Sequence, residues 1–229
     1  MPYLCLLLSG AALLINGLAA LGRIPLRDSA VFSLLIGTTQ LVLGAVYAGT
    51  AGGGDPRLLP GASGMILFGL TYLYVGLDVL LQLGSKGLGW FSGLVGAFGI
   101  LLAMLWFPDD PLLSVLWLSW AFLWILFFVR LALGCEGLAP FIGWALVLTS
   151  QVTATIPAFV GLVGHWPYDR GIAGGTAAAV GVLLVVAGVL GRRQGQGPAA
   201  WARPEAAGRR SRNSTEPLSH AIEPTRTRG

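Results

Sequence analysis

The sequence predicts an all-α protein that crosses a membrane seven times. Of its 229 residues, 55% are hydrophobic and only 10% are charged, whereas a soluble domain carries about 25% charged residues. The mean hydropathy is +0.77. A bilayer core of about 30 Å requires about 20 apolar residues per helix, and seven windows of the chain provide them. These observations predict a polytopic helical membrane protein.

The expected helices follow one another with only short connections. Each connection contains glycine, proline or charged residues, which end helices; examples are GRIPLRD after the first window and PDDP after the fourth. No connection is long enough to hold a soluble domain. The expected windows are 3–21, 29–49, 62–83, 89–107, 111–133, 139–163 and 172–190.

Lysine and arginine gather on one side of the expected topology. The opposite side has only Arg57 and Arg170. Because cytoplasmic loops are enriched in basic residues, we expect the N-terminus outside and the C-terminal tail in the cytoplasm. The net charge of +4 therefore reflects topology and does not indicate a nucleic-acid partner. The basic side holds Arg23, Arg27, Lys86, Arg130 and the eight arginines after residue 190.

The remaining reactive residues argue against an enzyme. Cys5 and Cys135 lie on opposite sides of the expected membrane, so both are predicted to be free thiols. Two histidines are too few for a metal site or a histidine-based catalytic triad, and we expect no cofactor. Residues 191–229 are rich in Arg, Gly, Pro and Ser, which predicts a disordered tail that is either solvated or in contact with anionic lipid.

Polar and aromatic residues on four expected helices share single helix faces. Lipid offers no hydrogen bonds, so such faces usually point into the bundle. In the third window, Leu70, Tyr74 and Asp78 follow one another at four-residue spacing, with Thr71 beside them. The other faces are Leu6, Ser9, Leu13 and Asn16; Trp117, Trp120 and Trp124 with Leu123; and Thr149, Gln151, Thr153 and Thr155, which precede a kink expected at Pro157.

Together these faces predict a narrow lumen that is mostly apolar and aromatic, with a few neutral hydrogen-bonding groups. An ion would lose its hydration there without compensation. The lumen therefore favours a small, flat, neutral and polar solute, because the rings provide flat walls while Asn, Tyr and Thr side chains exchange hydrogen bonds. Urea and short amides fit this description.

Each of these residues also has a structural interpretation. From helix geometry alone the tryptophans are more often explained by packing between helices, and Asn16 is compatible with an interhelical hydrogen bond. Asp78 is either a functional acid inside the membrane or a group near the cytoplasmic interface. Trp106 is expected to be an interfacial belt residue. The glycines of the fourth and seventh windows are expected to let helices pack closely.

Six stretches carry a resemblance to a known family: LLINGLAALGRI, AVFSLLIG, FGLTYLYVG, KGLGWF, WLSWAFLW and TATIPAF. They resemble the AmiS/UreI family, which contains proton-gated urea channels and short-chain amide transporters. The likeness spans residues 3–166, nearly the whole six-helix unit of the family.

The resemblance implies a six-helix channel bundle, to which this chain adds a seventh transmembrane helix. Family channels have one pore in each protomer, assemble as hexamers and narrow at two constrictions of aromatic and aliphatic side chains. The implied organisation is a channel unit at 1–166, an extra helix at 167–190 and the tail at 191–229. The implied pore residues are Leu6, Ser9, Leu13, Asn16, Leu70, Tyr74, Trp117, Trp120, Leu123 and Trp124.

Two features depart from the proton-gated members. Thr149 occupies the position at which the urea channels carry a pore glutamate, which is closer to the amide-transporter branch, and we include it among the candidate pore residues. The outer loops also nearly lack histidine.

We therefore expect a passive channel for urea, acetamide and similar amides in the bacterial inner membrane. Two alternatives remain open. One is a proton-coupled amide carrier in which Asp78 is the proton site. The other is a seven-helix sensor or scaffold that transports nothing.

Overall fold

The computed structural model describes residues 2–51 and 58–195. Arg57 and the tail beyond residue 195 lie outside the described residues, so the expectations placed on them are not addressed. The first five residues of the expected tail, 191–195, continue the last helix, so this helix ends later than the sequence suggested.

Seven helical segments are long and apolar enough to cross a membrane, which confirms the predicted all-α polytopic fold. The fifth and sixth are joined by a short 3-10 turn, η2 (Glu136–Leu138), and the sixth is divided by a π-helical turn, η3 (Gln151–Thr155). The helices are α1 (Pro2–Ala20), α2 (Leu26–Ala51), α3 (Leu59–Leu81), α4 (Lys86–Trp106), α5 (Pro111–Leu131), α6 (Ala139–Ser150), α7 (Ile156–Leu162) and α8 (Arg170–Gly195).

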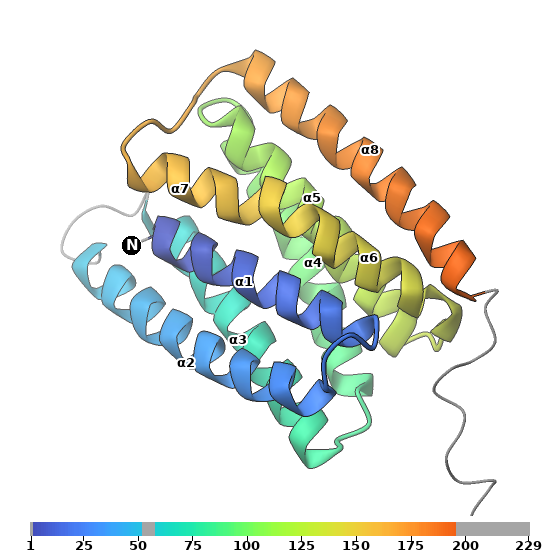
Figure 1. Ribbon diagram of the computed structural model, residues 1–229. Helices are drawn as coiled ribbons and strands as arrows, with labels where there is room; N and C mark the ends of the chain where they lie inside the picture. Colours follow the sequence, from blue (N-terminus) through green and yellow to red (C-terminus); the bar gives the residue numbers. More distant parts are fainter. Residues whose placement is uncertain (1, 52–57, 196–229) are drawn as a thin grey trace, which may run out of the picture. The chain divides into compact units, whose positions relative to one another are not determined.

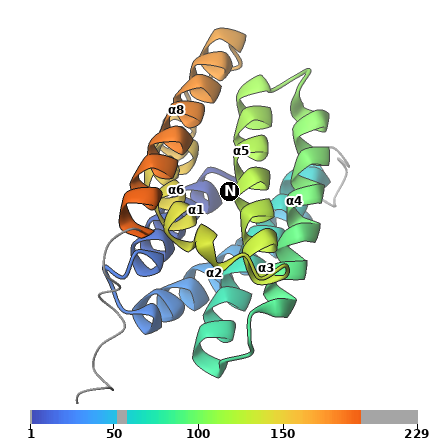
Figure 2. The same ribbon diagram turned by 90° about the vertical axis from the view of Figure 1, so that its right-hand side faces the viewer.

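Six of the spans form a closed ring in chain order. Each of α1 to α5 packs against the next helix, and α6 packs against α1 to close the ring. Helix α8 lies outside it, along α6 and α5 (Figure 1). The view turned by 90° shows α8 on the opposite side of the bundle from α4 (Figure 2). The seventh helix therefore adds to the ring from outside and leaves it intact.

Glycines set the closest helix contacts within the ring. A Cβ atom on Gly37 of α2 would lie 2.8 Å from the carbonyl oxygen of Gly69 on α3, so only glycine permits this approach. On α4, Gly93, Gly96 and Gly99 face α5 in the expected manner. In the seventh window the expectation does not hold within this chain for Gly174, Gly175 and Gly181, since Cβ atoms there would meet no atom within 4 Å.

Tight turns end the helices next to two aspartates. Asp110 caps the N-terminus of α5 by accepting a hydrogen bond from the Leu113 backbone N–H at 2.9 Å, and Pro111 occupies the first helical turn. At the other end of the bundle, Gln82 and Ser85 have φ angles of 54° and 57° in the left-handed region. The Asp78 carboxylate accepts hydrogen bonds from the Ser85 backbone N–H and hydroxyl, which hold this strained turn in place.

The kink expected at Pro157 corresponds to the turn η3 immediately before it. The Ile156 backbone N–H donates to the Gln151 carbonyl oxygen, an i to i+5 bond that inserts one extra residue into the helical turn. Proline cannot donate to the preceding turn, which accounts for the irregular hydrogen bonding at this place. Thr149, just before this turn, and Thr153, within it, are both buried in the bundle.

Candidate functional site: two cavities and an aromatic cluster

Two cavities lie within the bundle, and each has an aspartate at its border. The Asp110 cavity has a volume of about 380 Å³, and the Asp78 cavity has a volume of about 360 Å³. Helices α1, α3 and α5 contribute residues to both of them. Phe68 and Trp120 line both cavities, so these two side chains form the boundary between them.

Phe68 stands among three indole rings at this boundary. Its ring centroid lies 5.1 Å from that of Trp120 at an interplanar angle of 89°, and 4.6 Å from that of Trp124 at 65°. Trp117 and Trp124 are stacked at 20° and 6.4 Å. None of the four side chains is more than 6% exposed. This aromatic cluster, Phe68, Trp117, Trp120 and Trp124, separates the two cavities.

A hydrogen bond fixes the orientation of Trp120. Its indole Nε1–H donates to the Thr153 hydroxyl at 3.2 Å, and that hydroxyl donates to the Thr149 carbonyl oxygen at 2.9 Å. The π-helical turn thus holds the ring that borders both cavities. Thr149 itself is 1% exposed, donates to the Ala145 carbonyl oxygen and lines neither cavity.

The expected face of α1 runs past both cavities. Leu6 and Ser9 line the Asp110 cavity, whereas Leu13 and Asn16 line the Asp78 cavity. The Asn16 amide also donates to the Ser33 hydroxyl of α2 at 2.9 Å. The two interpretations of Asn16 are therefore compatible, because it binds a neighbouring helix and borders a cavity.

The expected face of α5 also runs past both cavities. Trp117 lines the Asp110 cavity, Trp120 lines both cavities, and Leu123 and Trp124 line the Asp78 cavity.

Two of the three residues expected on the α3 face line neither of these cavities. Leu70 is 39% exposed on the outside of the chain, and Tyr74 lies against Phe91 of α4 at 6.3 Å between ring centroids. Neither lines a cavity; Phe68 and Tyr72 of the same helix do so.

The difference between the expected and the observed inward face of α3 has a geometric cause. Each four-residue step overshoots the 3.6-residue helical turn by about 40°, so a series of such steps winds around the helix. By the same geometry, Leu70 lies about 160° around the axis from Phe68. The alternative spacing of Phe68, Thr71, Tyr72 and Val75, at i, i+3, i+4 and i+7, stays on one face and was available in the sequence.

Asp78 borders its cavity while serving a structural role. It is 6% exposed, and its carboxylate holds Ser85 in the turn before α4. Arg130 lines the same cavity but pairs with Glu136 at 3.4 Å, an exposed contact of little energetic weight. The hydrogen bonds to Ser85 account for the buried carboxylate at this position.

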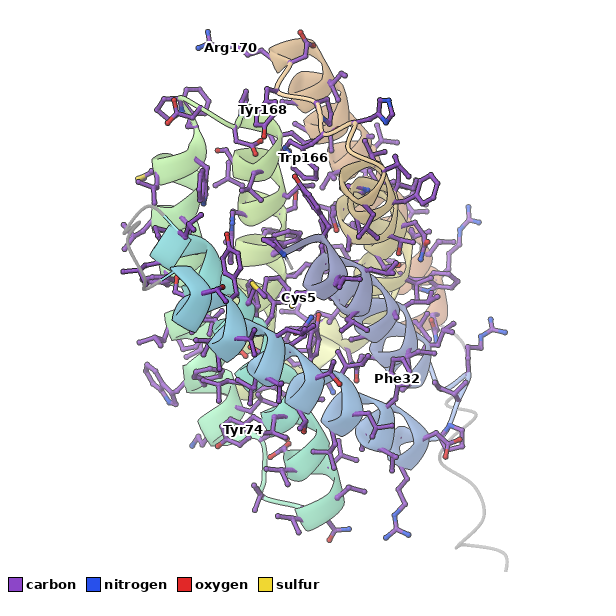
Figure 3. All side chains as sticks on the ribbon, turned by 90° about the vertical axis from the view of Figure 1, so that its left-hand side faces the viewer. Cys5, Phe32, Tyr74, Trp166, Tyr168 and Arg170 are labelled. Carbon is purple, nitrogen blue, oxygen red and sulfur yellow. The ribbon has the colours of Figure 1, made fainter. Side chains whose placement is uncertain are left out.

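Aromatic residues close around Asp110 at the other end of the bundle. The Trp166 indole donates to the Asp110 carboxylate at 2.9 Å and packs on the Tyr3 ring at 5.3 Å. Figure 3 shows Trp166 and Tyr168 at the end where α8 begins, with Cys5 deeper in the bundle. Burial raises the pKa of the Asp110 carboxyl group, against the opposing effect of its bonds from Leu113 and Trp166.

Trp106 is the last residue of α4, as an interfacial position requires, but it has further contacts. It lines the Asp110 cavity and packs against the core, so it is not a residue whose only neighbours are lipids.

Within the described residues, no group of three or more His, Cys, Asp or Glu side chains is arranged to hold a metal ion. Cys5 is buried, Cys135 is exposed, and both are free thiols, which confirms the expectation from their spacing.

Comparison with known proteins decides the family. A family model described as AmiS/UreI family transporter matches residues 1–165. The chain belongs to the AmiS/UreI family. Its relatives are transporters and channels rather than enzymes. The matched residues contain the whole six-helix ring and both cavities, apart from contacts made by Trp166 and Tyr168.

Named relatives in the AmiS/UreI family share much of the chain. A protein of Rhodococcus erythropolis named as the transporter AmiS2 is 44% identical over 187 residues, covering 81% of this chain and 90% of that protein. An amidate substrates transporter protein of Mycolicibacterium smegmatis is 37% identical over 187 residues, covering 80% and 87% of the two chains. Both matches cover more of the chain than residues 1–165, so they extend into the segment after the ring.

The closed-state structure of the urea channel of Helicobacter pylori has the same fold. It matches with a TM-score of 0.66 and 26% identity, and the match covers 73% of this chain and all of that one. The six-helix ring thus accounts for the structural similarity of this AmiS/UreI protein.

Proposed function

We propose that this protein is a passive channel for urea and short-chain amides such as acetamide. The solute would pass from the Asp110 cavity, across the aromatic cluster, into the Asp78 cavity. The observation that carries the proposal is that Phe68 and Trp120 border both cavities. Removal or rotation of these two rings would therefore join the cavities into one path.

The chemistry of the boundary supports a planar neutral solute. The rings offer flat apolar walls, and the polar groups that line the cavities include the uncharged hydroxyl and indole groups of Ser9, Trp117 and Trp124. An ion stripped of water here would meet no compensating charge. A small amide keeps its oxygen and nitrogen atoms hydrogen-bonded in the plane of the molecule while its faces slide along the rings. Relatives described as an amidate substrates transporter and a urea channel fit this class.

The charge distribution supports an orientation with the Asp78 cavity toward the cytoplasm. Arg130 lines this cavity, and Arg23, Arg27 and Lys86 lie in or beside the turns at the same end. Arg170 lies at the other end, beside Trp166 and Tyr168. By the positive-inside tendency, the N-terminus and the Asp110 cavity face outward.

We further propose that residues 1–166 form the transport unit and that α8 is an accessory helix. The support is that α8 packs outside the closed ring and contributes no residue to either cavity. By resemblance to the family channels, a hexamer with one pore in each protomer is the expected assembly.

The function is tested by light scattering from vesicles that contain the purified protein. We expect urea and acetamide to enter these vesicles faster than empty vesicles without any ion gradient, and glycerol to enter at the background rate. Equal rates for protein-containing and empty vesicles with every amide would contradict the proposal.

A second candidate is a proton-coupled carrier with Asp78 as the proton site. The observation that favours it is a nearly buried carboxylate at the border of a cavity. The sensor or scaffold hypothesis finds no support in a family of transporters.

A further inference from the structure

The side chain of Gln40 on α2 makes an unusual set of contacts behind the aromatic cluster. It is fully buried, and its Nε2 amide donates to the Cys5 carbonyl oxygen at 2.7 Å and to the Ser9 hydroxyl oxygen at 2.8 Å. Its Oε1 oxygen has no hydrogen-bond partner among the described residues. A buried acceptor without a partner is destabilising, so this arrangement calls for a compensating role.

The orientation of the amide follows from its neighbours. A backbone carbonyl oxygen only accepts hydrogen bonds, so the Cys5 carbonyl requires the nitrogen end of the amide to face it. Turning the amide over would set Oε1 against that carbonyl oxygen. The contacts with α1 therefore fix Gln40 as a donor and leave its own oxygen without a partner.

The Gln40 contacts change which hydrogen bonds the Ser9 hydroxyl can make. Other serine and threonine hydroxyls in these helices, including those of Thr71, Ser92 and Thr153, donate to the carbonyl four residues earlier. For Ser9 that carbonyl belongs to Cys5 and receives Gln40 instead. The Ser9 hydroxyl oxygen also accepts from Gln40, and no described residue accepts its proton. The Ser9 hydroxyl proton therefore has no hydrogen-bond acceptor among the described residues and is available to a solute.

Ser9 lies where such a donor would meet a solute. It lines the Asp110 cavity together with Phe68, Trp117 and Trp120. The Tyr72 hydroxyl, which contacts the Ser9 carbonyl oxygen at 3.4 Å, borders the other cavity. Ser9 is thus level with the boundary, where a solute entering the aromatic cluster loses water from its own oxygen.

We propose that Gln40 is a positioning residue that turns the Ser9 hydroxyl into a hydrogen-bond donor for the carbonyl oxygen of the solute. The pair would select solutes with a strong acceptor oxygen, such as urea and acetamide, over thiocarbonyl analogues of the same shape. This inference rests on the proposed channel function and adds a selectivity element to it.

The variant that tests the inference is Gln40→Met, because methionine has a similar length and no donor. Ser9 is then free to donate to the Cys5 carbonyl oxygen, and the unpartnered oxygen of Gln40 is gone. We expect thermal stability to be equal to or above that of the wild type. Urea permeability should fall about two- to tenfold, the effect of one neutral hydrogen bond, while thiourea permeability stays nearly unchanged.

Three further variants make the experiment specific. Ser9→Ala should lower the urea-to-thiourea permeability ratio as Gln40→Met does, and the double variant should lower it no further, because both changes remove one interaction. Ser9→Thr retains a hydroxyl and should retain most of the ratio. Thr39→Val, an exposed neighbour of Gln40 whose hydroxyl donates to the Leu35 carbonyl oxygen, should leave the ratio unchanged.

The outcomes separate this inference from the channel function. A folded Gln40→Met protein with the wild-type ratio overturns the inference and leaves the channel standing. If Gln40→Met does not fold, the comparison of Ser9→Ala with Ser9→Thr decides, and equal ratios in these two overturn the inference. Wild-type vesicles that take up urea no faster than empty ones instead contradict the channel function itself.

Discussion

Trp120 shows how one residue combines core packing with a position between two cavities. Its ring is 4% exposed, as in a core residue, yet it borders both cavities and has its N–H bound to Thr153. The sequence leaves open whether Trp120 packs between helices or borders a cavity. In the structure it does both, so the two interpretations do not exclude each other. On the proposed path, good packing of Trp120 would itself close the connection between the two cavities.

We predict that Trp120→Ala joins the two cavities and admits larger solutes. Replacing a fully packed tryptophan costs about 3–5 kcal/mol, and the existing cavities on both sides should keep the loss at the lower end. Glycerol permeability should rise on the order of tenfold or more, equivalent to about 1.4 kcal/mol of barrier. Vesicle shrinkage with urea and glycerol, measured beside thermal unfolding, checks both effects.

Trp90→Ala is the matched control. Trp90 is 63% exposed on α4, packs on Phe128 at 5.2 Å and lines neither cavity. The Trp90→Ala variant should leave the urea-to-glycerol permeability ratio at the wild-type value. A Trp120→Ala protein that loses stability while keeping the wild-type ratio would show that Trp120 only packs.

Asp110 predicts a pH dependence of stability. Burial raises its pKa above the ordinary value of 3.8, so the folded protein binds this proton more tightly than the unfolded chain. The stabilisation is complete below the ordinary pKa and is lost as the pH rises through the raised pKa. We expect the difference in melting temperature between the wild type and Asp110→Asn to favour the wild type most at acidic pH.

Thermal unfolding of both proteins in detergent, from pH 3.5 upward, measures this difference. Asparagine still caps α5, so the comparison isolates the charge and its contact with Trp166. A difference that grows in favour of the wild type as the pH rises would contradict the assignment, because it would require a lowered pKa.

At the scale of elements, the turn η3 in the sixth span is linked to the aromatic cluster by the hydrogen bond between Thr153 and Trp120. A regular helix would orient Thr153 differently, since the extra residue of a π-helical turn rotates the side chains that follow it. The hydroxyl of Thr153 is fully buried and joins the helix backbone to Trp120. The irregular turn therefore serves to hold a ring on a neighbouring helix.

We predict that Thr153→Val releases Trp120, whereas Thr153→Ser does not. Valine has nearly the shape of threonine but leaves the buried indole N–H without an acceptor, which costs about 1–3 kcal/mol. The Val variant should unfold at a lower temperature and pass urea with altered selectivity, and the Ser variant should resemble the wild type. Equal selectivity of the Val and Ser variants would contradict this role for the hydrogen bond.

At the scale of the whole molecule, six helices close a ring whose two cavities meet at one aromatic boundary. This arrangement favours the proposed channel with a local barrier, because movement of Phe68 and Trp120 would connect the cavities that both rings line. A carrier would also need a group that binds a proton in step with the solute, and Asp78 is the candidate at the cavity border.

We predict that amide flux needs no proton gradient and that Asp78→Asn retains it. Asparagine keeps an oxygen for Ser85 but cannot take up a proton. Permeability of urea should remain within about threefold of the wild type, less than 1 kcal/mol of barrier. Uptake that occurs only with an imposed gradient, and disappears in Asp78→Asn at normal stability, would instead establish the carrier.

Much of this organisation is readable in the sequence because it depends on local pattern. Runs of about 20 apolar residues specify spanning helices wherever they occur, and the spacing of Leu6, Ser9, Leu13 and Asn16 keeps them on one side of α1. The tryptophans of α5 follow the same rule. These predictions needed only helix geometry, and their residues do lie beside the cavities.

The sequence by itself determined an all-helical membrane protein with seven spans and the residues of two helix faces. Only the tertiary structure decided that α3 turns Phe68 and Tyr72 inward rather than Leu70 and Tyr74, because an apolar helix can offer either face and its neighbours select one. Only the structure brought Gln40 against Ser9, since that contact joins residues 31 positions apart on two helices. Contacts between helices depend on their relative rotation, which no local pattern encodes.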